Sequence, residues 1–206
     1  MRREGALIVY DIQNRVSRRL LVGDNSVQAK DFLTTINSTQ LVREMVLFRV
    51  FTVRPNVDSI ALSRDGSQLY FASVNDPQLY QVATKDLRDA TLSPEQLAHR
   101  VTVFCNKTQS DGMTTDSAGN IYYGDMEKSA IVRINTQLSE PTYETLFQSD
   151  LLLRWPDGFS FGPDGYLYVT CSALQYVLGC SDWTIQAKSP YFLFRFKPGF
   201  SAPAGQ

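Results

Sequence analysis

Three copies of one pattern constrain the fold of this chain most strongly. The copies are "NVDSIALSRDGSQLYFAS" (56–73), "QSDGMTTDSAGNIYYGD" (109–125) and "WPDGFSFGPDGYLYVTC" (155–171). Each contains an aspartate near its start, a short alternating run, a turn with glycine and a strand rich in tyrosine. The aspartate and the turn glycine are eight residues apart in every copy: Asp58 and Gly66, Asp111 and Gly119, Asp157 and Gly165. This register predicts three copies of one β-hairpin.

Two further strands follow the hairpin in the first two copies. The third strands are "QLYQVAT" and "AIVRINT", and the fourth strands are "RVTVFCN" and "TYETLFQ". Successive aspartates are 53 and 46 residues apart, close to the roughly 40–50 residues of a four-stranded propeller blade. The segment "LSPEQLAHR" (92–100) predicts one short helix between strands, because Ser93 can cap it and Pro94 suits its first turn. The expected fold is therefore an all-β, four-stranded-blade β-propeller.

The repeats also predict how the chain is divided. We expect one partial propeller domain over 1–206, with the end of a preceding blade in 1–55, blades in 56–108 and 109–154, and an incomplete blade in 155–206. An incomplete ring of about three to four blades leaves open sheet edges, which only full closure removes. We expect the missing blades to come from another chain or from self-association.

Composition excludes several classes of partner. Lys and Arg number 20 and Asp and Glu number 21, without long runs of either sign, so nothing favours nucleic acid or an anionic membrane. The apolar runs are too short for the roughly 20 residues of a membrane span. The charged start "MRREGALIVYD" is not a signal peptide. The one histidine, His99, lies in the expected helix, which argues against a histidine triad or a zinc site.

The three repeated aspartates are the main candidates for a site. In a propeller the innermost strand of each blade runs beside the axis, so Asp58, Asp111 and Asp157 are expected to converge at one channel mouth. Turns on the same face add Asn75 and Asp125 as candidate ligand-binding residues. Alternatively, each aspartate only caps its own strand. Convergent carboxylates need a counter-charge, which could be Ca²⁺ held by oxygen ligands or an organic ammonium group.

Four segments together resemble the major royal jelly protein/yellow family. They are "GALIVYDIQNRVSRRLL", "VDSIALSRDGSQLYFASVNDPQLYQV", "SDGMTTDSAGNIYYGDMEKSAIVR" and "WPDGFSFGPDGYLYVT". The resemblance covers nearly the whole chain, and corresponds to the C-terminal portion of a family member. It implies a six-bladed, secreted and often glycosylated protein. Where the family usually reads "VDGIALSP", this chain has Ser59 and Arg64.

The resemblance implies two classes of function. Some members bind biogenic amines in the central channel, which suggests a secreted propeller that binds a small cationic amine or a metal at its mouth. Others are linked to dopachrome conversion, so a dopachrome tautomerase is an alternative. A metal-dependent lactonase is another, because "SDGM" and "PDGF" resemble gluconolactonase-like propellers. Those enzymes also use a glutamate from the first blade, which is absent here. Binding is favoured over catalysis because no nucleophile, histidine base or complete metal set can be assembled; an inactive fragment is the third alternative.

The cysteines and two sequons point to an oxidising compartment. Cys171 and Cys180 are expected to form a disulfide across the long segment 171–190, which we interpret as a lid, and Cys105 would be left over. The sequons Asn37-Ser38-Thr39 and Asn106-Lys107-Thr108 predict glycosylation at Asn37 and Asn106. Together with the resemblance they predict an extracellular protein.

Overall fold

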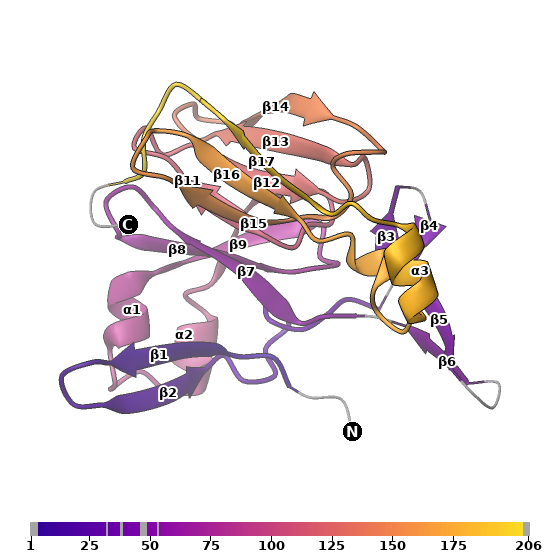
Figure 1. The fold of residues 1–206 in the computed structure, drawn as a ribbon. Coiled ribbons are helices and arrows are strands. Elements are labelled where there is room, and N and C mark those ends of the chain that lie inside the picture. Colours follow the sequence, from indigo (N-terminus) through magenta and orange to yellow (C-terminus); the bar gives the residue numbers. More distant parts are fainter. Residues whose placement is uncertain (1–3, 32, 38, 46–48, 53, 204–206) are drawn as a thin grey trace.

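The computed structural model describes residues 4–31, 33–37, 39–45, 49–52 and 54–203, and β-strands dominate it (Figure 1). Each of the three repeats forms one antiparallel sheet. The first sheet contains β7 (Val57–Leu62), β8 (Gln68–Ser73), β9 (Gln78–Ala83) and β10 (Thr102–Asn106). The second contains β11 (Met113–Thr115), β12 (Ile121–Asp125), β13 (Ala130–Asn135) and β14 (Thr142–Gln148).

The third sheet has three strands in the described part of the chain. They are β15 (Pro156–Phe161), β16 (Leu167–Cys171) and β17 (Phe192–Phe196), with β17 at the edge. The predicted all-β fold and its antiparallel four-stranded sheets are therefore confirmed for the first two repeats. The unit boundaries and the incomplete ring stay predictions.

The hairpin turns follow from the glycines that the repeat predicted. Gly66, Gly119 and Gly165 have φ angles of +69°, +90° and +74°, a region that residues with a side chain rarely adopt. In the second and third turns an aspartate also accepts a hydrogen bond from a tyrosine hydroxyl: Tyr122 to Asp116 at 2.8 Å, and Tyr168 to Asp164 at 2.9 Å. These bonds tie each turn to the strand that follows it.

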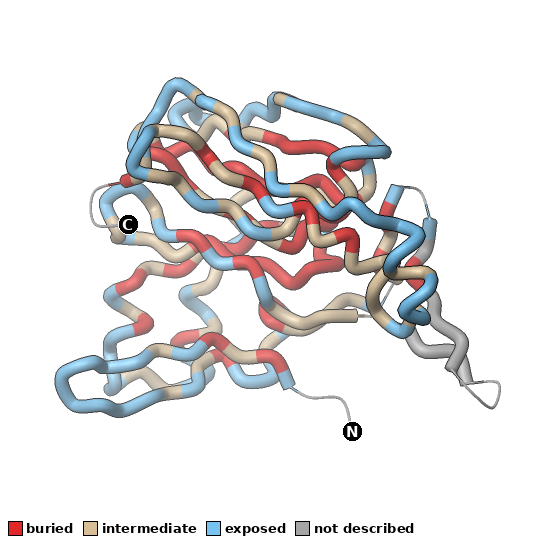
Figure 2. Tube along the Cα trace, viewed as in Figure 1, coloured by how far each residue is buried: buried red, intermediate tan, exposed pale blue. Residues whose placement is uncertain are grey.

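The core lies between neighbouring sheets, where Figure 2 shows the buried residues concentrated in the central strands. Between the first and second sheets, Tyr70, Leu79, Ile121 and Tyr123 belong to one buried cluster. Between the second and third sheets, a second cluster contains Tyr122, Ile131, Leu153, Leu167 and Val169. The innermost strands also meet, since β11 contacts both β7 and β15. The first strand of each repeat is therefore the innermost, as a propeller requires.

The N-terminal quarter forms three hairpins. They pair β1 (Leu7–Asp11) with β2 (Val16–Leu20), β3 (Thr35–Ile36) with β4 (Thr39–Gln40), and β5 (Val42–Met45) with β6 (Arg49–Thr52). The first hairpin packs on the first sheet in a cluster that contains Leu7, Phe71 and Leu97. The segment around β3 and β4 crosses the loops at one end of the sheets: Ile36 and Leu41 pack with Val74, Met126 and Trp155.

Four short helical elements complete the fold: α1 (Thr84–Arg88), α2 (Pro94–Ala98), the 3-10 helix η1 (Leu174–Tyr176) and α3 (Asp182–Ala187). The predicted helix is α2, and Ser93 caps it in a reciprocal pair with Gln96. Both η1 and α3 lie in the long segment 171–190, whose function as a lid stays a prediction. None of the described helices reaches the length and hydrophobicity that a bilayer span requires.

Candidate functional site

Two of the three repeated aspartates lie at β-bulges. The pairing of β7 with β8 shifts register between Val57 and Ser59, so Asp58 lies in the irregular position. The pairing of β15 with β16 shifts between Pro156 and Phe159, which includes Asp157. Asp111 lies two residues before β11 begins. Bulges redirect a side chain away from the regular alternation of a strand, so the carboxylates of Asp58 and Asp157 are positioned by local interruptions of the inner strands.

The residue after each aspartate explains why the copies read Asp-Gly. A Cβ atom placed on Gly112 would lie 1.5 Å from the carbonyl oxygen of Asp157 in the next sheet, so no side chain fits there. In the first copy the same position is Ser59, and its hydroxyl donates to the carbonyl oxygen of Asp111. Successive inner strands therefore approach one another through the residue that follows the aspartate. Serine replaces glycine only in the first copy, where the hydroxyl of Ser59 bonds the neighbouring strand.

Asp58 and Asp157 affect the protonation of Asp111. Asp111 is buried, and its Oδ2 accepts a 2.6 Å hydrogen bond from the indole Nε1 of Trp155. Burial raises the pKa of Asp111 to about 7, and the charges of Asp157 and Asp58 add to the rise while the Trp155 bond opposes it. The pKa of Asp157 is also raised, first by burial and also by Asp58, against a hydrogen bond from Ser172. Repulsion of this kind would be relieved by a bound cation.

Among the residues that the structure describes, no group of three His, Cys, Asp or Glu side chains is placed to hold a metal. One carboxylate oxygen of Asp111 accepts from Trp155. Binding of Ca²⁺ by Asp58, Asp111 and Asp157 stays a prediction. What the three carboxylates offer is negative charge beside an aromatic ring.

Asn75 and Asp125 are the two further candidates. Asn75 lies in the turn after β8, and Asp125 is the last residue of β12. The amide of Asn75 accepts from the backbone N–H of Lys30 at 2.9 Å and donates to its carbonyl at 3.0 Å. The carboxylate of Asp125, which is buried, accepts from the backbone N–H of Lys128 at 3.0 Å. Both side chains thus hold backbone next to the inner strands, and their ligand-binding function stays a prediction.

Sequence analysis missed a buried lysine beside these turns. The Nζ of Lys107 donates to the carbonyl oxygens of Asp76 and Thr108 at 3.0 and 3.1 Å. Burial lowers the pKa of Lys107 to about 8, although the charge of Asp76 opposes this. Lys30 pairs with the same Asp76 at 3.0 Å. Lys30 thus joins the turn at Asp76 to the N-terminal segment, and Lys107 joins the same turn to the chain after β10.

The expected disulfide is wrong: Cys105, Cys171 and Cys180 are all free thiols. Cys171 ends β16 and is buried in the cluster between the second and third sheets, where burial raises the pKa of its thiol to about 11. The Sγ of Cys180 instead lies 3.9 Å from the carbonyl oxygen of Gln175 and 3.8 Å from that of Leu178. Strand β16 therefore places the thiol of Cys171 in the core. The thiol of Cys180 lies next to backbone carbonyls of its own loop.

The glycosylation candidates are both exposed residues. Asn37 has a left-handed backbone, φ 44°, and its N–H donates to the carbonyl of Met126 at 3.0 Å. Asn106 ends β10, and its carbonyl accepts from the hydroxyl of Tyr143 at 2.6 Å. The middle residue of the first sequon, Ser38, lies outside the described residues. Modification at either asparagine stays a prediction.

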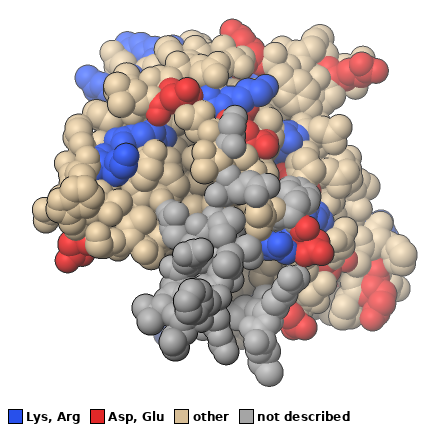
Figure 3. Space-filling model, turned by 90° about the vertical axis from the view of Figure 1, so that its right-hand side faces the viewer, with Lys and Arg blue, Asp and Glu red and all other residues tan. Residues whose placement is uncertain are grey.

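Charge is mixed on the side of the molecule that carries α3 and the β3–β4 hairpin. Figure 3 shows Lys and Arg interspersed with Asp and Glu there, and neither sign covers the described surface of this face. This agrees with the balanced composition of 20 basic and 21 acidic residues. A surface of this kind offers no extended positive patch to a phosphate backbone.

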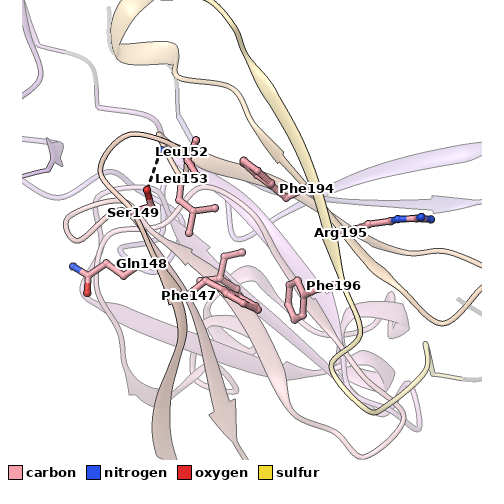
Figure 4. A pocket seen from close by; sticks show the side chains of 9 residues that line it. Phe147, Gln148, Ser149, Leu152, Leu153, Phe194, Arg195 and Phe196 are labelled. Carbon is pink, nitrogen blue, oxygen red and sulfur yellow. Dashed lines mark hydrogen bonds between the residues drawn. The ribbon is translucent and has the colours of Figure 1, made fainter.

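An apolar cavity of about 290 Å³ opens between β14 and β17 (Figure 4). Phe147, Phe194 and Phe196 line it, and the rings of Phe147 and Phe196 meet edge to face at 4.9 Å. Leu152 and Leu153 close one end, where the N–H of Leu152 donates to Ser149 Oγ at 3.2 Å. The cavity lies beside the strand that ends the three-stranded sheet, away from the three repeated aspartates.

Antiparallel sheets whose innermost strands meet, each supplying an aspartate to the same place, define a protein of the β-propeller class. The family profile Major royal jelly protein matches residues 2–183, and the chain belongs to this family. No curated protein matches the sequence.

One of the similar solved structures has a TM-score high enough to support the fold. A luciferin-regenerating enzyme is 18% identical, with a TM-score of 0.51 over 75% of this chain and 50% of that chain. Regucalcin from Agrobacterium tumefaciens, a calcium-binding protein, is 22% identical over 76% of this chain and 50% of its own, with a TM-score of 0.46. A gluconolactonase from Xanthomonas campestris is 13% identical over 70% and 44%, with a TM-score of 0.47. The chain thus spans about half the length of these structures or less.

Proposed function

We propose that the chain binds a small organic cation, such as a protonated aromatic amine, at the cluster formed by Asp58, Asp111 and Asp157. One observation supports this most: a buried carboxyl, Asp111, has its pKa raised to about 7 beside two further carboxylates. A cation placed there would offset their repulsion. The indole of Trp155, which donates to Asp111, provides an aromatic surface next to the charge.

The other candidate functions have less support. Ca²⁺ binding and a metal-dependent lactonase have less support, because the described residues contain no group of three His, Cys, Asp or Glu side chains placed for a metal. A dopachrome tautomerase needs an acid and a base of matched pKa; Asp111 could serve as one of them, and no second group is assigned. Family membership and the exposed Asn37 and Asn106 support an extracellular, glycosylated protein. We also propose that a second copy or another chain covers the open edges of the sheets.

Calorimetric titration with tyramine tests the amine site. We expect binding at pH 7 to release protons, because a nearby cation favours the charged form of Asp111. The released protons are measured as a difference in heat between two buffers of different ionisation enthalpy. Asp111→Asn should weaken tyramine binding by roughly 1–3 kcal/mol, the scale of a charged hydrogen bond.

Two controls make the result specific. Tyrosol carries the same ring and a hydroxyl in place of the amine, and should not bind detectably if charge provides the recognition. Asp164→Asn removes a carboxylate from the exposed turn of the third hairpin, where it bonds Tyr168 and Arg195. It should leave tyramine affinity unchanged. Equal affinity for tyramine in the wild type and in Asp111→Asn would refute the proposed site.

A further inference from the structure

A second cavity, of about 310 Å³, lies beneath the long segment 171–190. Its walls come from four places: the β3–β4 hairpin with Leu41, Ser129 before β13, the residues Asp150 and Arg154 before β15, and the loop and helix that carry Gln175, Tyr176, Cys180 and Thr184. None of the three repeated aspartates lines it. The cavity therefore differs in position and in chemistry from the proposed amine site.

Two cations lie over the ring of Tyr176, which lines this cavity together with Arg154. The guanidinium of Arg154 lies 5.8 Å from the ring centre of Tyr176, and the Nζ of Lys188 lies 4.8 Å from the same ring. Neither cation forms an ion pair with a carboxylate in the described part of the chain, where the ion pairs join other residues. Arg154 is partly withdrawn from water, and a cation in such a position usually has an anionic partner. Arg154 therefore favours an anion at its end of the cavity, although Asp150 also lines the cavity.

Two polar atoms beside the cavity lack a protein partner. The terminal nitrogens of Arg154 donate to the carbonyls of Lys188 and Pro190 at 3.0 and 2.8 Å. Its Nε–H and the carbonyl Oε1 of Gln175 are buried without a hydrogen bond to any described residue. One atom is a donor and the other an acceptor. A molecule that satisfies both must carry an acceptor and a donor of its own.

The backbone around the cavity is held in an unusual conformation. Four of the six described non-glycine residues with positive φ are here: Asn37, Ser129, Trp155 and Ala173. Asn37 and Ser129 line the cavity, while the N–H of Ala173 bonds the carbonyl of Arg154 at 3.1 Å. Left-handed backbone at residues with side chains costs energy and gathers at ligand sites more often than elsewhere.

We infer that this cavity binds a small organic acid: a carboxylate toward Arg154 and Lys188, a hydroxyl or amino donor toward Gln175, and an apolar portion against Leu41. Ring stacking on Tyr176 orients the two cations, so the carboxylate meets a fixed pair of charges. Segment 171–190 then has a binding function, because it supplies Gln175, Tyr176, Cys180 and Thr184 to the lining.

Calorimetry with 4-hydroxyphenylacetate, which has the carboxylate, the ring and a hydroxyl, tests this inference. Arg154→Gln should raise the dissociation constant about tenfold or more, as expected for a hydrogen-bonded charge. Because Arg154 also holds residues 188–190, Lys188→Gln provides a milder variant, with an expected rise of about two- to fivefold. The matched control is Lys197→Gln: Lys197 also lies over a tyrosine ring, that of Tyr166 at 4.9 Å, but this ring does not line the cavity. It should leave the dissociation constant unchanged.

The position of the bound acid is tested by the thiol of Cys180, which lines the cavity. Saturating 4-hydroxyphenylacetate should slow its alkylation, located by peptide mapping, and should not slow that of Cys105. The uncharged 4-hydroxyphenylacetamide should bind at least tenfold more weakly than the acid. Asp111→Asn should not change affinity for the acid, so failure here is distinguishable from failure of the amine site. Equal affinity in Lys188→Gln and Lys197→Gln, or no protection of Cys180, would overturn the inference.

Discussion

The raised pKa of Asp111 predicts that removing its charge stabilises the protein above neutral pH. In the folded state the pKa is about 7, compared with an ordinary value of 3.8. The folded protein therefore binds a proton that the unfolded chain has lost between pH 4 and 7. The stabilising contribution of protonated Asp111 is complete below about pH 4 and is lost as pH rises through about 7. Asp111→Asn, which resembles the protonated acid, should not lose it.

The size of the effect follows from the same values. A difference of roughly three pKa units corresponds to roughly 4 kcal/mol, at about 1.4 kcal/mol per unit. Part of this is shared with Asp157, whose pKa is also raised, since interacting carboxyls titrate together. The asparagine can still accept the bond from Trp155 and donate toward Asp58. We therefore expect Asp111→Asn to increase the free energy of unfolding by about 2–3 kcal/mol at pH 8 and by little at pH 4.

Urea denaturation at pH 4 and pH 8 measures this difference. Trp155 is buried and Trp183 is 78% exposed, so the change in tryptophan fluorescence reports mainly on the site. The control is Asp65→Asn, because hydrogen bonds from Ser63 and Ser67 lower the pKa of Asp65 to about 2. That variant should lose stability above pH 4, the opposite direction. A lower free energy of unfolding for Asp111→Asn at pH 8 would show that Asp111 is a structural cap and would refute the reasoning.

Three other predictions follow from the packing. Gly112→Ala should lower the free energy of unfolding by about 1–3 kcal/mol, because its Cβ would meet the carbonyl of Asp157. An unchanged urea midpoint would contradict the close approach of Gly112 to Asp157. Alkylation in urea without reduction should modify all three cysteines, and a disulfide in the peptide map would contradict the free thiols. The chain should self-associate through β17, so Leu193→Lys, at a position 64% exposed, should lower the mass measured by light scattering; an unchanged mass would exclude that edge.

The sequence predicted those parts of the fold that depend on local chemistry. The three hairpin turns need a glycine with positive φ, and helix α2 needs a cap. Residues close in sequence meet both requirements. That the three aspartates together form one site stays a prediction of the shared register. Contacts across long separations could not be predicted: the indole of Trp155 reaches a carboxylate 44 residues away. The cavity under segment 171–190 could not be predicted either, because Arg154 and Lys188 reach the ring of Tyr176 only in the folded chain.

The contact between Trp155 and Asp111 leads to a last prediction. The indole hydrogen bond lowers the pKa of Asp111 and so limits the effect of burial. Trp155→Phe removes the donor and keeps an aromatic ring in the cluster with Ile36, Leu41 and Met126. We expect the pKa of Asp111 to rise further, which moves the pH-dependent loss of stability above pH 7. Urea midpoints measured from pH 5 to 9 by circular dichroism detect this shift, and Trp183→Phe is the control, since Trp183 is exposed. A profile that does not move relative to the wild type would mean that Trp155 contributes packing alone to the site.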